Sequence, residues 1–161
     1  MNTENIAETL TVLFGELVDG PPGQASYMLN RGDAGLLRSL DTLTARDASR
    51  VPAGGGSSVA AHVDHVRYGL SLMNRWAHGE NPFESADWSA SWRKQNVSDD
   101  EWQQLRAELR AEAHKWLEVL REPREVHRME LNGMVGSIAH LAYHLGAIRQ
   151  IDRAARGPAE Q

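Results

Sequence analysis

Apolar residues recur at three- and four-residue steps in four long stretches of the chain, which is the spacing of amphipathic helices. The stretches cover residues 3–18, 58–78, 98–120 and 131–155. Glycine or proline interrupts the pattern after each of the first three, and no stretch shows the alternation typical of a strand. The sequence therefore predicts an all-α protein, arranged as an antiparallel four-helix bundle.

A shorter apolar repeat over residues 36–43 predicts a short extra helix between the first and second long helices. Ser57 or Ser58 is expected to cap the second helix, while Ser98 and Glu101 have the spacing of a capping box at the start of the third. Three glycines inside the fourth helix predict that a neighbour approaches closely there. They are Gly133, Gly136 and Gly146.

The length of 161 residues is that of one domain able to bury a core without disulfides or a structural metal. We expect a single domain over residues 1–156 and a disordered tail over residues 157–161. The net charge is −5 and no basic run is present, so we expect no binding to nucleic acid or to an anionic membrane. No segment reads as a signal peptide or a membrane span, which makes a cytoplasmic location the default expectation.

The fourth predicted helix carries two histidines, His140 and His144, four residues apart. Four residues turn a helix by about 400°, so both imidazoles leave the same face one turn apart and can share a metal ion. Leu141 follows the first histidine where a zinc metalloprotease of the HExxH type has its glutamate, so that activity is disfavoured.

A third ligand is available from the second predicted helix, which contains His62 and His65. His62 lies inside the apolar arc of that helix and His65 near its edge, so either can face the interior of a bundle. The chain has no cysteine, which restricts a metal site to His, Asp or Glu ligands. Three neutral imidazoles would leave a position open for water or a substrate atom.

These two histidine segments resemble those of the DinB-like proteins, a family of four-helix bundles with a three-histidine metal site. The resemblance rests on SVAAHVDH at residues 58–65 and on HLAYHLGAIRQ at 140–150, which is similar to the family's HxxxHxGxxRQ signature. It implies that His140, His144 and one histidine of the second helix bind the metal. The family's spacing of about seven residues from the helix cap favours His65 and leaves His62 as the alternative.

The resemblance also implies a function, because characterised members include transferases and isomerases that use low-molecular-weight thiols such as bacillithiol, glutathione and mycothiol. We therefore expect a metal-dependent transferase with a small-molecule substrate, a divalent metal (zinc or nickel) and a homodimeric assembly. Two alternatives stay open, a metal-dependent hydrolase and a non-catalytic metal- or ligand-binding protein. The catalytic residues and the substrate are not indicated by the sequence.

Three other side chains have two possible roles each. Trp88 and Trp92 lie in the long connection after the second helix, and they either plug the bundle or form a wall of the substrate pocket. Arg149 points about 140° away from His144, which predicts an ion pair with a neighbouring helix rather than an anchor for a substrate carboxylate.

Overall fold

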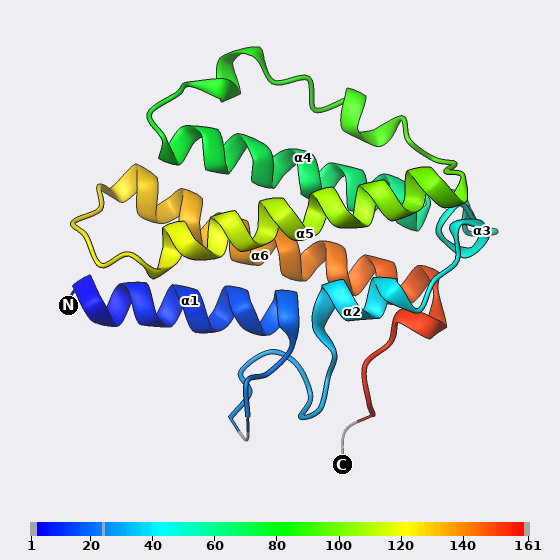
Figure 1. The fold of residues 1–161 in the computed structure, drawn as a ribbon, viewed down its shortest axis with the longest axis horizontal. Helices are drawn as coiled ribbons and strands as arrows, with labels where there is room; N and C mark the ends of the chain where they lie inside the picture. Colours follow the sequence, from blue (N-terminus) through cyan, green and yellow to red (C-terminus); the bar gives the residue numbers. More distant parts are fainter. Residues whose placement is uncertain (1–2, 24, 160–161) are drawn as a thin grey trace.

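The regular structure of the chain is helical throughout the part that the computed structural model describes, which is residues 3–23 and 25–159 (Figure 1). No strand occurs in these two ranges, so the all-α prediction is confirmed. The elements are α1 (Thr3–Asp19), α2 (Gly35–Asp41), α3 (Ala45–Ala48), α4 (Val59–Ala77), η1 (Pro82–Ser85), η2 (Ala90–Trp92), α5 (Asp99–Arg121), α6 (Arg128–Ile151) and η3 (Arg153–Ala155).

The long helices α1, α4, α5 and α6 form the body of the molecule. Both α1 and α4 pack against α5 and against α6. The colours of Figure 1 show that α1 and α6 run in one direction while α4 and α5 run in the other. The neighbours α4 and α5 are therefore parallel, which differs from the predicted antiparallel arrangement, because residues 78–98 carry the chain back along the bundle between them. A long crossover of this kind is a known variant of the helix bundle.

The core consists of the apolar stripes that the sequence pattern outlines. Phe14 of α1, Leu72 of α4, Leu109 of α5 and Ile148 of α6 are almost completely buried. Trp116 of α5 is buried as well, and its indole Nε1 donates a hydrogen bond of 2.8 Å to Ser137 Oγ of α6. Burial of this apolar surface is the main contribution that holds the helices together.

Side-chain caps fix where the helices begin. Ser58 accepts a hydrogen bond from Ala61 N at the start of α4, and Ser98 and Glu101 form the predicted capping box at the start of α5. The predicted extra helix is α2. A second capping box, between Thr44 and Asp47, starts the one-turn helix α3, which the apolar pattern alone does not reveal because it spans four residues.

The fourth long helix differs from its prediction at both ends, since α6 begins at Arg128 rather than Leu131 and ends at Ile151 rather than Ala155. Asp152 takes an extended conformation that stops the helix, and its carboxylate accepts a hydrogen bond from Ala154 N. The close approach predicted at the glycines occurs at Gly133, where an added Cβ would lie 2.9 Å from the Trp76 ring. At Gly136 and Gly146 the prediction is wrong, since no atom lies within 4 Å of such a Cβ.

Two buried acids hold the connection between α1 and α2 on the bundle. The carboxylate of Glu16 accepts hydrogen bonds of 2.6–3.1 Å from three successive backbone amides in this connection. They belong to Tyr27, Met28 and Leu29. Asp33 pairs with Arg149 of α6 at 2.7 Å, so the predicted ion pair of Arg149 forms with a residue of the connection and not with a helix.

The last described residues, 157–159, run beside the same connection. Asn30 Nδ2 donates a hydrogen bond of 2.8 Å to the Pro158 carbonyl, and the Cα of Gly157 lies so close to Asp33 that a Cβ there would overlap its carboxylate. Residues 160 and 161 lie outside the described ranges. The domain boundary at residue 156 stays a prediction.

Candidate metal centre

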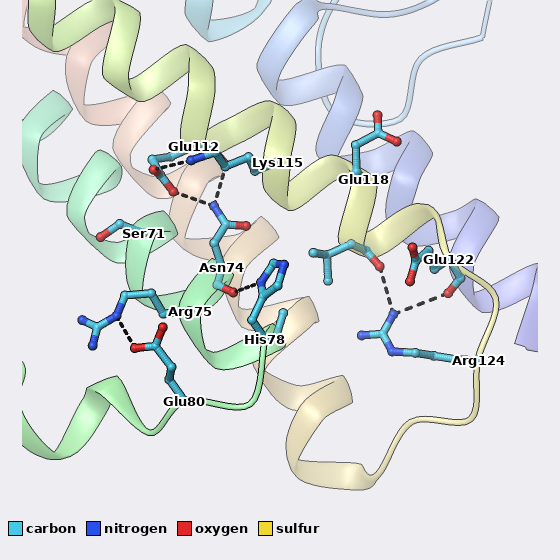
Figure 2. A pocket seen from close by; sticks show the side chains of 12 residues that line it. Ser71, Asn74, Arg75, His78, Glu80, Glu112, Lys115, Glu118, Glu122 and Arg124 are labelled. Atoms are coloured by element: carbon cyan, nitrogen blue, oxygen red, sulfur yellow. Dashed lines mark hydrogen bonds and ion pairs between the residues drawn. The ribbon is translucent and has the colours of Figure 1, made fainter.

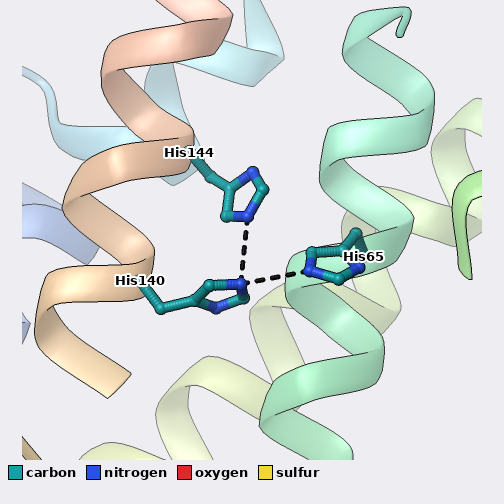
Figure 3. A group of neighbouring side chains, drawn as sticks. All are labelled: His65, His140 and His144. Atoms are coloured by element: carbon teal, nitrogen blue, oxygen red, sulfur yellow. Dashed lines mark hydrogen bonds between the residues drawn. The ribbon is translucent and has the colours of Figure 1, made fainter. Parts of the chain in front are cut away.

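Three histidines from two antiparallel helices come together in the bundle, His65 from α4 and His140 and His144 from α6 (Figure 3). The Nε2 atom of His140 lies 3.1 Å from that of His65 and 3.0 Å from that of His144. One ligand atom from each ring lies within 4.8 Å of the others. The arrangement places three imidazole nitrogens around one point, as a divalent cation requires.

The surroundings of these histidines favour the neutral imidazole, which is the form that binds metal. His144 and His65 are buried and His140 is partly buried. Burial, reinforced by the neighbouring imidazoles, lowers the pKa of His144 to about 3 and that of His65 to about 4. Burial also lowers the pKa of His140. The three lone pairs are therefore available at neutral pH.

A hydrogen-bond chain from the connection between α4 and α5 fixes which nitrogen of His65 faces the centre. The hydroxyl of Ser91 donates its one proton to the Trp88 carbonyl at 2.8 Å. It must therefore accept the 2.8 Å hydrogen bond that it shares with His65 Nδ1, which places the proton of the ring on Nδ1. The Nε2 lone pair of His65 then faces the other two histidines, as in known metal sites.

The second histidine of α4, His62, also lies at the centre, on the outer side of His144. Its Nδ1 lies 2.9 Å from His144 Nδ1, so one ring donates and the other accepts. If His144 offers the lone pair of Nε2 to a metal, its proton is on Nδ1 and His62 is the acceptor. In this geometry His62 orients the ring of His144. The three histidines close enough to share a metal ion are His65, His140 and His144.

Both tryptophans of the connection lie against the histidines. The ring of Trp92 stacks on His65, with centroids 4.2 Å apart and an angle of 24°, and meets His62 edge-on at 5.2 Å. Trp88 lies 5.8 Å from His65 and stays partly exposed. Gln95 ties this segment to the start of α4, because it accepts a hydrogen bond from Ser58 N and donates one to the Trp92 carbonyl. The tryptophans thus form a wall beside the histidines.

Ser91 contacts His65 of the centre, and the sequence alone does not indicate this contact. It lies in a connection without helical or strand periodicity, so no pattern indicates which of its side chains meets α4. Among the residues that the structure describes, the hydrogen-bond partners of the three histidine rings are histidines and Ser91. Tyr143 touches His144 with its ring edge at 5.1 Å but is largely exposed.

Comparison with known proteins agrees with this geometry. The model of the DinB superfamily matches residues 28–148, more than half of the chain. The chain belongs to the DinB superfamily. No curated protein and no solved structure matches it. The DinB match includes all three histidines of the centre, while α1 and Arg149 lie outside the matched residues. None of this DinB protein's helices in the described ranges is long and apolar enough to cross a membrane.

Proposed function

We propose that this protein is a metal-dependent transferase in which His65, His140 and His144 bind zinc or nickel and a low-molecular-weight thiol is the nucleophile. The observation that carries the proposal is the convergence of three neutral imidazoles, one with its tautomer set by Ser91. Membership of the DinB superfamily supports it further. The chain has no cysteine, so the sulfur of the reaction would come from the co-substrate.

A divalent cation held by three neutral ligands keeps its positive charge, and when bound it lowers the pKa of a thiol on its open side. In the transfer, the thiolate sulfur forms a bond to an electrophilic carbon of the acceptor. The bond from that carbon to its leaving group breaks, and the leaving group departs with the electron pair. The proton of the thiol passes to solvent.

The protein's own residues contribute position and shielding. Ser91 and His62 hold the rings of His65 and His144 by their Nδ1 atoms, which reduces the ordering required when the ligand binds. Trp92 covers one face of His65 and keeps water from it. Water exclusion strengthens the electrostatic effect of a bound cation on the thiol.

The first test is the metal content of untagged protein purified without a nickel column. We expect close to one divalent ion per chain in the wild type and its loss in His65→Ala and His144→Ala. The His62→Ala variant should keep the ion with about tenfold lower affinity, because it removes only an orienting contact. Loss of the ion in His62→Ala with retention in His65→Ala would assign the ligand of α4 to His62 instead.

Thiol binding is tested separately on the cobalt-substituted protein. A thiolate that joins cobalt adds a sulfur-to-metal charge-transfer absorption. We expect this band with at least one of bacillithiol, mycothiol and glutathione, and its absence from the metal-free protein. A spectrum that none of the three thiols changes would contradict the transferase proposal while leaving the metal site intact.

We also propose that the protein is a homodimer joined through α6. Residues 131–148 of this helix contain no Asp, Glu, Lys or Arg, so its exposed side lacks the charged residues that are typical of a solvated helix face. Met129, Val135 and Tyr143 of α6 are exposed in the single chain. A second copy would meet no charge repulsion there. Sedimentation should show a dimer for the wild type. Tyr143→Arg would place two cations against each other at the interface and should sediment as a monomer.

We also propose that the protein is cytoplasmic, which cell fractionation tests.

A further inference from the structure

An apolar pocket of about 190 Å³ lies against His140, between α4, α6 and the connection that carries η1. We refer to it as the apolar pocket. Its lining includes Gly69, Phe83, Trp88, Gly136, Ser137 and His140. Because His140 belongs to both the three-histidine group and this lining, a molecule in the pocket lies next to the candidate metal centre.

The lining offers almost no polar contact to a ligand. It contains no Asp, Glu, Lys or Arg. The hydroxyl of Ser137 has no proton left for a ligand, since it donates to the Met134 carbonyl at 2.7 Å, and it already accepts a hydrogen bond from Trp116 Nε1 at 2.8 Å. His140 and the indole N–H of Trp88 are the remaining polar groups of the lining. An ionised or strongly polar group would therefore lose its hydration here without replacement.

Two large aromatic side chains of the lining are partly open to solvent. Phe83 is 38% exposed and Trp88 is 41% exposed. The position of Trp88 is fixed by its neighbours, because its ring meets the Tyr68 ring edge-on at 5.7 Å and the Tyr68 hydroxyl accepts a hydrogen bond from Asp87 N. An apolar group in the pocket would cover this aromatic surface without a rearrangement of the chain.

The glycines of the lining leave the space for such a group. A Cβ at Gly69 would already touch the His140 ring at 3.6 Å and the Trp88 ring at 3.8 Å, whereas a Cβ at Gly136 would meet no atom within 4 Å. Buried apolar cavities of about 150 Å³ hold one benzene molecule. The apolar pocket therefore has room for one ring or a short alkyl chain.

A larger hollow of about 870 Å³, between α4 and α5, has the opposite character (Figure 2). Four of its charged side chains pair within the lining, Arg75 with Glu80 at 2.7 Å and Lys115 with Glu112 at 3.3 Å. Two more, Glu118 and Arg124, pair with residues outside it, Arg121 and Glu130. Asn74 also donates to Glu112. None of the three clustered histidines lines it. It offers no reason to place a reacting group there.

We propose that the apolar pocket is the acceptor subsite of the transferase, and that the acceptor carries an uncharged aryl or short alkyl group next to its electrophilic carbon. The proposal rests on the proposed function in assigning the pocket to the acceptor, because the low-molecular-weight thiols are polar and do not suit this lining. The pocket holds the apolar group against His140, within reach of a thiol at the three histidines.

The test is the binding of ethanol, 1-butanol and benzyl alcohol to the zinc-loaded protein, measured by titration calorimetry or NMR. The three probes share a hydroxyl and differ in apolar size, so we expect each added methylene to tighten binding about three- to fourfold. Affinity that does not depend on apolar size would overturn the proposal. No thiol is present, so this outcome is independent of the cobalt titration described above.

Matched variants of α6 locate the binding. Gly136→Leu places a side chain in open space at the lining and should lower the affinity for benzyl alcohol at least tenfold. Gly146→Leu, ten residues further along the same helix and equally unobstructed, should bind like the wild type. Trp88→Ala, which removes a partly exposed wall, should weaken binding as well. Wild-type affinity in both Gly136→Leu and Trp88→Ala would show that the probe binds elsewhere.

Discussion

The single proton of the Ser91 hydroxyl controls the orientation of His65 and leads to the first prediction. Ser91→Ala removes the acceptor of His65 Nδ1, so the ring loses the contact that fixes its tautomer. Partners of this kind contribute about 10- to 100-fold to metal affinity, and we expect a loss in that range in a chelator competition assay. Ser89→Ala is the control, because Ser89 bonds to exposed Asp87 in the same connection. Equal affinities of the two variants would contradict the role of Ser91.

The pKa values of the clustered histidines predict how the metal-free protein responds to acid. In the folded state the pKa is about 4 for His65 and about 3 for His144, against a usual value of 6.5. Between the folded-state pKa values and pH 6.5, the unfolded chain binds more protons than the folded chain. The free energy of unfolding is therefore highest above pH 6.5 and falls as the pH drops towards 4. We expect the urea midpoint of the metal-free protein to be lower at pH 5.5 than at pH 7.5. The double variant His65→Ala/His144→Ala should show a smaller difference.

At the scale of the helices, the features predicted correctly are those that depend on the spacing of residues along the chain. The long helices and the caps at Ser58 and Ser98 depend on residues three or four apart, and the structure confirms them. Helix α3 and the end of α6 depend on single polar side chains, Asp47 and Asp152, and the apolar pattern carries no information about such residues. Ser91 depends on how a connection without periodicity packs on α4, which only the folded chain determines.

The glycines of α6 give a prediction at the same scale. Alanine favours a helix over glycine by about 1 kcal/mol, so Gly146→Ala, with open space around it, should raise the free energy of unfolding by about that amount. Gly133→Ala should show no such gain, since its Cβ would press on the Trp76 ring at 2.9 Å. Urea denaturation of both variants measures the difference. An equal gain at the two positions would mean that Trp76 moves aside freely.

At the scale of the whole molecule, the Asp33–Arg149 pair joins the connection after α1 to the last turn of α6. Asp33 is buried, so replacing it with alanine leaves the Arg149 charge poorly compensated, and breaking such pairs costs about 3–5 kcal/mol. The control is Glu118→Ala, whose partner Arg121 is exposed, with an expected cost below about 1 kcal/mol. Similar urea midpoints for Asp33→Ala and Glu118→Ala would contradict a structural role for this pair.

The stacking of Trp92 on His65 also gives the molecule an intrinsic optical reporter. An open-shell ion such as nickel at the three histidines would quench the excited state of this indole, whereas zinc, with its filled d shell, has no such quenching route. Trp76, Trp102 and Trp116 supply a background, because none of them contacts the histidine cluster. Fluorescence during loading should therefore fall with nickel and hold with zinc, so that the unlabelled protein itself distinguishes the two ions.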